Sequence, residues 1–310
     1  MPRLRRCLAI HDLSGFGRVS LMLVIPTLSA MGIQVVPAPT AVLSTHTGGA
    51  FPDYRFQDLT ESMEENFAHW TDLQLDFDGI YSGFLGSPRQ CALVGSMIDQ
   101  CKKKDPLVLI DPVMGDRGQF YSSISPTMAR EMRQLIRKAQ VITPNLTELF
   151  LLLDQPYQAD LPKEAFRPLL SALAQQGPQQ IVVTSCPGDR PDQISCQIYD
   201  HGQFFQITHP YLEAQYQGTG DLYASLLMGL LLNQVPFVAA CGRACEQVQK
   251  LILSSKKSGE PYSDGVLLEA GLRELSELIT PFPQMVPGWR EKTEKERRSD
   301  RLSPHSKNQR

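Results

Sequence analysis

Short β-rich segments alternate with longer helical segments along most of this chain, and this alternation limits the possible folds more than any other feature. Such a pattern is typical of βαβ units, in which the strands lie parallel in one sheet and helices cover it. We predict strands over residues 7–11, 34–39, 79–82, 107–110, 141–143 and 181–185. Helices are expected near residues 19–31, 57–70, 87–103, 126–138, 146–153 and 163–176. The chain is therefore predicted to be an α/β protein with a mostly parallel central sheet and helices on both faces.

The last part of the chain departs from this alternation. Asp200-His201-Gly202 separates two β-rich segments, residues 194–199 and 203–208, and predicts an antiparallel hairpin between them. Helices are expected after it, over residues 221–233, 236–255 and 266–279. Beyond Trp289 the chain is rich in charged side chains and Ser and has almost no apolar ones. We therefore expect one domain over residues 1–284 and a disordered charged tail over residues 285–310.

Composition and charge argue against several classes of protein. The chain is 42% hydrophobic and 20% charged, with a net charge of −3, which favours a soluble domain without a nucleic-acid or membrane partner. The first apolar stretch, residues 7–10, is too short for a signal peptide, so we expect the protein in the cytoplasm. The seven cysteines form no C-x-x-C pair and are expected to be reduced. Cys241 and Cys245, four residues apart, are interpreted as small buried side chains rather than as a metal or redox pair.

The sequence Gly218-Thr219-Gly220-Asp221 stands directly before an apolar helical segment. Glycines let backbone N–H groups approach a phosphate closely, and the first turn of a helix offers unpaired donors at the positive end of its dipole. Asp221 in that turn could take a proton from a hydroxyl group that attacks the phosphate. A glycine-rich turn with an acidic cap would have the same sequence, so both interpretations stay open.

Glycine-rich polar turns follow three of the predicted strands. They cover residues 11–17, 44–49 and 82–86 and contain hydroxyl side chains and the aromatic Phe84. Ligands of open α/β sheets bind beyond the carboxyl ends of the strands, so these turns fit a small polar ring compound. Ordinary strand-to-helix turns would explain each of them singly.

Carboxylates and an amide follow two further strands. Asp111 and Asp116 come after the fourth strand, and Asn145 and Glu148 after the fifth. Mg²⁺ takes one or two carboxylates together with waters and phosphate oxygens, so the pattern predicts a magnesium–phosphate site. Asn145 and Glu148 also have the spacing of a helix capping box, and that alternative stays open.

Taken together, these motifs resemble those of the pyridoxal (pyridoxine, pyridoxamine) kinase family in the ribokinase-like superfamily. The matching segments are residues 12–15, 44–48, 82–87, 111–116, 143–148, 184–185 and 218–221. They occur in the family's order and extend over roughly residues 7–256 of the chain.

The resemblance implies a ribokinase-like three-layer α/β/α fold and ATP-dependent phosphorylation of the 5′-hydroxymethyl group of a vitamin B6 ring. The implied catalytic residues are Asp221 as the base and an anion hole of Gly218, Thr219 and Gly220. The implied ring contacts, besides Asp221, are Ser14, Thr47 and Phe84. The implied ATP contacts are Asn145, Glu148, Thr184, Ser185 and Gly220. Mg²⁺ would be served by Asp111, Asp116, Thr143 and Glu148, with Thr143 also implied for a monovalent cation such as K⁺. A homodimer is also implied, and residues 115–121 are expected to close over ATP, with Gly118 as a flexible point.

Two departures from the family leave the ring specificity open. Better-known members carry tyrosine where Phe84 stands, and the segment from His11 to Gly15 is closer to the hydroxymethylpyrimidine kinases. Hydroxymethylpyrimidine kinase is therefore the alternative activity. A nucleotide-binding relative without turnover is a third hypothesis, which the presence of Asp221, Asp111, Asn145 and Glu148 disfavours.

Overall fold

The computed structural model describes residues 4–279 except 48–50, 52, 102–104 and 123. Residues 1–279 form one compact unit. The predicted boundary at residue 284 and the predicted tail over residues 285–310 lie outside the described residues, so both stay predictions. Within residues 4–279 as described, no helix combines the length and the apolar composition that crossing a bilayer requires.

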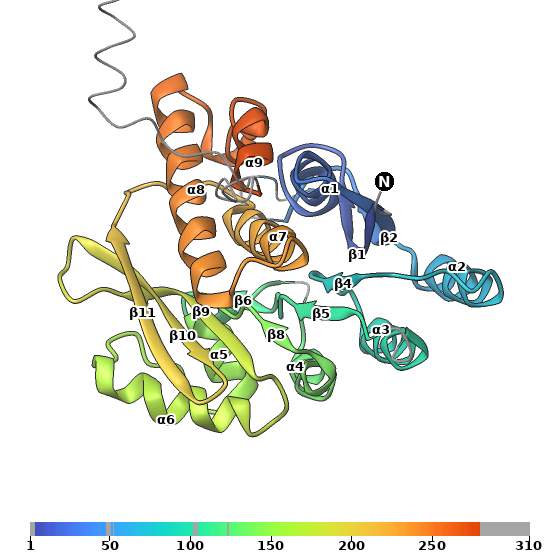
Figure 1. Ribbon diagram of the computed structural model, residues 1–310, viewed down its shortest axis with the longest axis horizontal. Helices are drawn as coiled ribbons and strands as arrows, with labels where there is room; N and C mark the ends of the chain where they lie inside the picture. The colour runs from blue at the N-terminus through green and yellow to red at the C-terminus, as the bar shows by residue number, and fades with distance from the viewer. Residues whose placement is uncertain (1–3, 48–50, 52, 102–104, 123, 280–310) are drawn as a thin grey trace, which may run out of the picture. The chain divides into compact units, whose positions relative to one another are not determined.

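A single large sheet runs through this unit (Figure 1). In the described residues it has nine strands, in the order β11-β10-β9-β8-β5-β4-β1-β2-β3. The strands are β1 (Arg5–Ser14), β2 (Ile33–Leu43), β3 (Phe56–Asp58), β4 (Gly79–Ser82), β5 (Leu107–Ile110), β8 (Val141–Ile142), β9 (Gln180–Pro187), β10 (Gln193–Asp200) and β11 (Gln203–Pro210). The six strands from β2 to β9 in this order are parallel, and β10, β11 and β3 are antiparallel to their neighbours. The predicted parallel strands and the predicted hairpin are thus confirmed.

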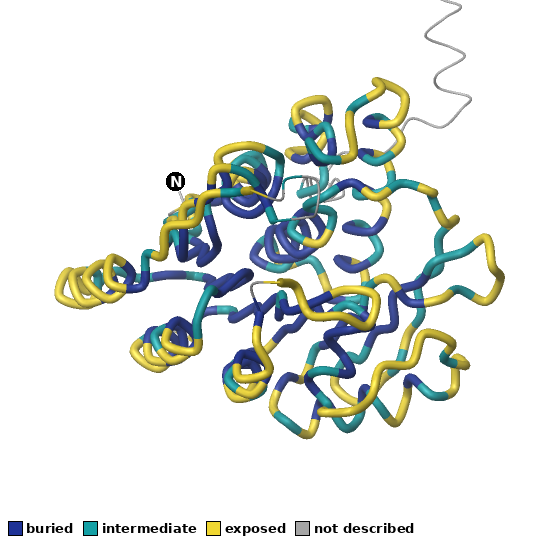
Figure 2. The backbone as a smooth tube through the Cα atoms, turned by 180° about the vertical axis from the view of Figure 1, so that it is seen from behind, coloured by how far each residue is buried: buried dark blue, intermediate teal, exposed yellow. Residues whose placement is uncertain are grey.

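Helices cover both faces of the sheet and complete the three layers (Figure 1). One face carries α2 (Thr60–Asp72), α3 (Pro88–Cys101), α4 (Pro126–Leu135), α5 (Leu146–Leu153) and α6 (Lys163–Ala174). The other carries α1 (Ser20–Ala30), α7 (Thr219–Leu232), α8 (Phe237–Ser258) and α9 (Leu272–Leu278). Side chains of β1 alternate between the two cores, with Leu8 on the first face and Cys7 on the second. Figure 2 shows the central strands as buried, whereas α2 is largely exposed.

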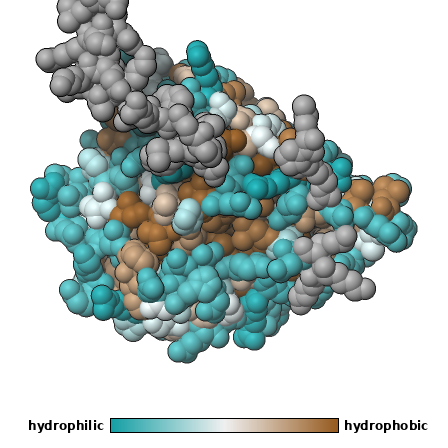
Figure 3. All heavy atoms as spheres, in the orientation of Figure 1, coloured by the Kyte–Doolittle hydropathy of each residue, from teal (hydrophilic) through white to brown (hydrophobic). Residues whose placement is uncertain are grey.

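Helix α7 is apolar around most of its circumference because it packs against the sheet as well as against α1 and α8. A Cβ atom at Gly79 of β4 would collide with the Met228 side chain of α7, so glycine lets this helix approach the sheet closely. Apolar side chains gather in the middle of the face that Figure 3 shows, between the two helical layers, and polar ones surround them.

Two predicted helices begin later than expected. The helix expected over residues 57–70 begins at Thr60, because residues 56–58 pair with the end of β2 as β3 and Asp58 Oδ1 accepts a hydrogen bond from the Thr60 N–H (2.8 Å). Phe56 is an exposed residue of this strand and lies outside α2. The helix expected over residues 266–279 begins at Leu272, after a non-helical stretch whose buried Val266 and Leu268 pack into the second core.

Candidate active site

The start of α7 has the backbone expected for an anion-binding turn. Gly218 precedes the helix with φ of 75°, and a side chain at that position would collide with the Arg18 carbonyl oxygen. A Cβ atom at Gly220 would meet nothing within 4 Å, so the first turn of the helix borders open space. Unpaired N–H groups of this turn are therefore available to a ligand.

Asp221 lies in this first turn and is partly buried. Its Oδ2 accepts a hydrogen bond from the backbone N–H of Ser20 at the start of α1 (2.9 Å). Burial raises the pKa of Asp221 to about 7; the Ser20 N–H acts in the opposite direction, and the negative charge of Asp12 adds to the increase. A carboxylate with such a pKa can both accept and release a proton near neutral pH, which suits a general base.

Asp12, at the end of β1, forms a second buried carboxylate beside Asp221. It accepts hydrogen bonds from the hydroxyl groups of Ser14 (2.9 Å) and Ser20 (2.5 Å). Burial raises its pKa, and both hydroxyl groups oppose that effect. Since a hydroxyl group has one proton to donate, Ser14 can meet a bound ring only as an acceptor while this bond persists.

Asp111 and Glu148 are buried at the same edge of the sheet. Burial raises the pKa of Asp111 to about 8, Asp221 contributes to the increase, and the Thr143 hydroxyl opposes it. Burial also raises the pKa of Glu148, with the charge of Asp111 as the next cause. Within the described residues, neither carboxylate forms an ion pair with Lys or Arg. Two buried, mutually repelling carboxylates of this kind fit a divalent cation, which would offset their repulsion.

The helix-capping alternative for Asn145 and Glu148 is confirmed. Asn145 Oδ1 accepts from the Glu148 N–H (3.0 Å), and Glu148 Oε2 accepts from the Asn145 N–H (2.8 Å). Glu148 Oε1 also accepts from the Met114 N–H (3.0 Å), and the Asn145 amide donates to the Gly115 carbonyl (2.8 Å). The first turn of α5 therefore anchors the segment after β5, and any ligand contact of these two side chains would add to that structural role.

Residues 115–120 form a small hairpin that the sequence interpretation treated only as a mobile segment. Its strands are β6 (Gly115–Asp116) and β7 (Gln119–Phe120). Arg117 and Gly118 make the turn with φ of 51° and 79°, as a two-residue type I′ turn requires. The Thr147 hydroxyl accepts from the Gly118 N–H (2.9 Å), which holds this turn against α5.

Not all predicted metal ligands are buried together. Asp116 lies exposed on the hairpin, where its Oδ1 accepts from the Arg117 N–H (2.8 Å), whereas Asp111, Thr143 and Glu148 are buried. In the described part of the chain, no three His, Cys, Asp or Glu side chains are close enough to enclose a metal ion. A cation here would need water or phosphate oxygens to complete its coordination, as Mg²⁺ commonly does.

Of the remaining predicted ligand residues, Phe84 and Thr47 follow β4 and β2, whereas Thr184 and Ser185 lie within β9, which continues to Pro187. Phe84 is buried, and its carbonyl group accepts a hydrogen bond from the Thr40 hydroxyl (3.0 Å). Thr47 is partly buried, and Gly48 and Gly49 of its motif lie outside the described residues. Thr184 is partly buried with its N–H bonded to the Pro144 carbonyl (2.9 Å), and Ser185 is exposed in a left-handed conformation with φ of 57°.

Gln90 of α3 is a buried residue near this edge that the sequence interpretation missed. Its Oε1 accepts from the Gly86 N–H (2.7 Å), and its Nε2 donates to the Thr40 carbonyl (2.8 Å) and the Thr60 hydroxyl (3.0 Å). Gln90 thus ties the turn containing Phe84 to β2 and α2. No motif surrounds it in the sequence, because its partners come from three separate elements.

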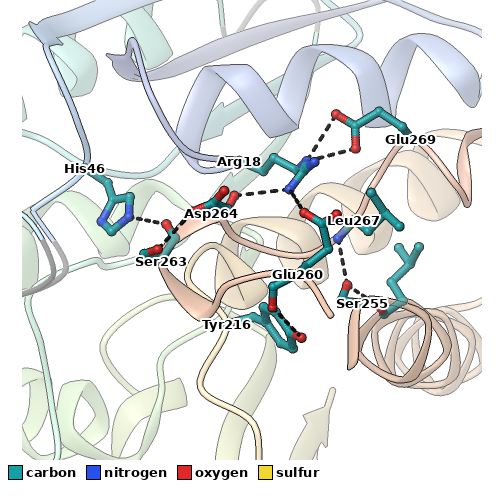
Figure 4. A network of polar contacts seen from close by, with 10 residues as sticks. Arg18, His46, Tyr216, Ser255, Glu260, Ser263, Asp264, Leu267 and Glu269 are labelled. Carbon is teal, nitrogen blue, oxygen red and sulfur yellow. Dashed lines mark hydrogen bonds and ion pairs between the residues drawn. The ribbon is translucent and has the colours of Figure 1, made fainter. Parts of the chain in front are cut away.

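Arg18 was missed for the same reason. Its guanidinium group bonds to Glu260 (3.1 Å), Glu269 (2.8 Å) and the Asp264 carbonyl (3.5 Å) (Figure 4). Its backbone N–H also donates to the Asp264 carbonyl (2.9 Å). His46 Nε2 meets the Ser263 carbonyl in the same region (2.6 Å; Figure 4). These contacts hold the turns after β1 and β2 against the segment that follows α8.

Comparisons with known proteins show which family this chain is similar to. Residues 25–264 match the sequence profile described as phosphomethylpyrimidine kinase. A Bordetella avium protein named pyridoxine/pyridoxal/pyridoxamine kinase is 30% identical over 247 residues, which is 74% of this chain and 79% of that protein.

Two solved structures are similar in both sequence and fold. A provisionally named phosphomethylpyrimidine kinase from Bacteroides thetaiotaomicron, crystallised with pyridoxal, has 44% identity and a TM-score of 0.84, covering 88% of this chain and 96% of that one. Pyridoxal kinase from Lactobacillus plantarum has 33% identity and a TM-score of 0.81, covering 89% and 98%.

Proposed function

Because this chain belongs to the phosphomethylpyrimidine kinase family and, by its relatives, to the pyridoxal kinases, we propose that it phosphorylates the 5′-hydroxymethyl group of a vitamin B6 compound with ATP. Asp221 carries this proposal. It is a partly buried carboxylate with a pKa of about 7, in the first turn of a helix that begins with Gly218 and borders open space. The similarity to a structure that contains pyridoxal supports the ring class.

Asp221 accepts the proton of the attacking hydroxyl group as the phosphoryl group moves to oxygen. The Ser20 N–H holds one oxygen of this carboxylate, which leaves the other free to face the hydroxyl group. The N–H groups of Gly218, Thr219 and Gly220 and the positive end of the α7 dipole stabilise the negative charge that spreads over the phosphoryl oxygens.

Asp111 and Glu148 hold Mg²⁺ in this proposal, with Asp116 from the hairpin and Thr143 completing the predicted set. When bound, Mg²⁺ neutralises the charge of the ATP phosphates and orients them. Thr143 also serves a monovalent cation such as K⁺. The buried Asp111–Glu148 pair supports the divalent cation, because its raised pKa values reflect burial and mutual repulsion that the cation would relieve.

Thr184, Ser185 and Asn145 bind ATP in this proposal, and the β6–β7 hairpin covers it. Ser14, Thr47 and Phe84 bind the vitamin ring, with Ser14 as an acceptor because its proton is bonded to Asp12. Closure of the hairpin over ATP excludes water from the phosphoryl group during transfer.

Purified protein with Mg-ATP should release ADP selectively with pyridoxal, pyridoxine or pyridoxamine at equal concentrations. Hydroxymethylpyrimidine is the fourth substrate to test, because the matching family profile is that of phosphomethylpyrimidine kinases. Preference for the pyrimidine would replace the proposed activity by a role in thiamin synthesis. Nucleotide binding without turnover of any of the four compounds would indicate a non-catalytic relative.

The assembly and location of the protein are also proposals. The family resemblance supports a homodimer in the cytoplasm. Size-exclusion chromatography with light scattering should give twice the chain mass of 34.6 kDa, and a monomer at micromolar concentration would contradict the dimer.

A further inference from the structure

Two thiol groups meet in the core between the sheet and α8. Cys196 lies on β10 and Cys245 on α8, and their sulfur atoms are 3.4 Å apart. Both side chains are buried, with exposed fractions of 8% and 6%. Cys196 and Cys245 are 49 residues apart in the sequence. The sequence pattern pointed only to Cys241 and Cys245, which are four residues apart, so it did not suggest this pair.

The surroundings of Cys245 differ from those of the other six cysteines. A hydrogen bond from the Cys196 thiol lowers the pKa of Cys245 to about 6 against the effect of burial, and His209 of β11 acts in the same direction. Cys245 in turn raises the pKa of His209, and Cys196, as the donor, has a pKa well above its usual range. The pKa of every other cysteine in the chain is raised, with burial as the first cause for all but Cys196. A thiolate stabilised by a histidine and a second thiol is the reactive form of cysteine.

We propose that Cys245 and Cys196 are a peroxide-reactive thiol pair, which closes to a disulfide between α8 and β10. This proposal is independent of the kinase activity. The sulfur atoms would have to approach by roughly 1.4 Å to reach the S–S bond length.

The chemistry requires hydrogen peroxide as the oxidant. The Cys245 thiolate attacks one peroxide oxygen, the O–O bond breaks, and the departing hydroxide takes a proton from His209 to become water. The Cys196 sulfur then attacks the sulfenic sulfur of Cys245, an S–S bond forms, the S–O bond breaks, and the thiol proton leaves with the oxygen as a second water. Two thiols are oxidised by two electrons, and one peroxide is reduced to two waters.

Burial limits which oxidants can enter. Cys196 and Cys245 are exposed by only 8% and 6%, and His209 Nε2 is also buried, so hydrogen peroxide, a molecule about the size of water, is the oxidant best suited to reach the pair. Glutathione disulfide is far larger, and its reaction with the folded protein should therefore be much slower than that of hydrogen peroxide.

The test uses the full chain, treated with hydrogen peroxide at neutral pH and analysed by intact mass and peptide mapping. The wild type should lose about 2 Da and yield one peptide pair joined through Cys196 and Cys245. Cys196→Ser should stop at a sulfenic acid on Cys245, which dimedone traps, and Cys245→Ser should give neither product. Cys241→Ser, one turn earlier on α8, is the matched control and should still form the disulfide.

Absence of the Cys196–Cys245 link at peroxide concentrations that oxidise the urea-unfolded chain would overturn the proposal. So would an equal yield of linked peptides through Cys241 in Cys245→Ser. Should Cys245→Ser fail to fold, His209→Gln provides the second test: it keeps both thiols and should slow disulfide formation by about tenfold, through the loss of thiolate. An unchanged rate in His209→Gln would contradict the role given to the imidazole and, with it, the proposed chemistry.

Discussion

The pH dependence of turnover tests the role of Asp221 most directly. The carboxyl group must be ionised to accept a proton, and burial raises its pKa to about 7. Activity is therefore lost as pH falls through this value: the ionised fraction is about 0.9 at pH 8 and about 0.1 at pH 6, so kcat/KM should fall about tenfold between them. The profile is measured with pyridoxine and Mg-ATP, both below their KM.

Substrate ionisation could produce a similar acid limb, and a variant separates the two causes. Asp12→Asn removes a negative charge that helps to raise the pKa of Asp221, so the acid limb should move to lower pH. A limb caused by the substrates would stay where it is, because both proteins are assayed with the same compounds. Asp221→Asn should lower kcat by about 10²–10⁴-fold with ATP affinity retained in calorimetry. A kcat/KM that stays constant between pH 6 and 8 in the wild type, or turnover retained in Asp221→Asn, would refute the assignment of the base.

Three further predictions concern the walls of the site. Gly218→Ala should lower the free energy of unfolding, measured in urea, by more than about 1 kcal/mol, because the positive φ and the nearby Arg18 carbonyl oppose a side chain. Gly220→Ala is the control and should cause no such loss, because a Cβ atom there meets open space. Equal losses in the two variants would contradict the tight turn. Gln90→Leu should lower the free energy of unfolding by about 1–3 kcal/mol in the same assay, because it leaves buried donors and acceptors unpaired. In a kinetic assay it should raise KM for the vitamin more than it lowers kcat. An unchanged KM would show that Gln90 has no role in ring binding. Mg²⁺ at 100 times its Kd should stabilise the wild type by about 2.7 kcal/mol in thermal unfolding, and Asp111→Asn should lose this effect; a Mg²⁺ response retained in Asp111→Asn would place the cation elsewhere.

Local patterns allowed much of the fold to be predicted. The six parallel strands and the hairpin were each found where their β-rich segments stand, because strand formation depends on residue types over a few positions. The capping box of Asn145 and Glu148 is also local, since both partners lie within one helical turn. The first residues of the helix expected over 57–70 belong to strand β3, because their pairing with β2 outweighed the local preference for a helix.

Less of the site could be predicted, because its contacts join distant parts of the chain. Asp221 was predicted from the sequence, but the Ser20 N–H that bonds to its carboxylate lies 201 residues earlier in the chain. Gln90 and Arg18 were missed because neither has a motif and their partners come from several elements. The predicted metal residues divide between the buried Asp111 and Glu148 and the exposed Asp116, a difference that depends on the path of the β6–β7 hairpin.

The sequence alone determined most of the strands and helices, where the glycine-rich helix start lies, and which carboxylates follow the strands. These properties depend on periodicity, turn chemistry and backbone preferences within a few residues. Only the tertiary structure decided that Asp12 lies close enough to Asp221 to raise its pKa, and that Cys196 meets Cys245. The order of the strands in the sheet and the packing of the helices on it decide which residues form such pairs. Burial and neighbouring charges shift each pKa, and both exist only in the folded chain.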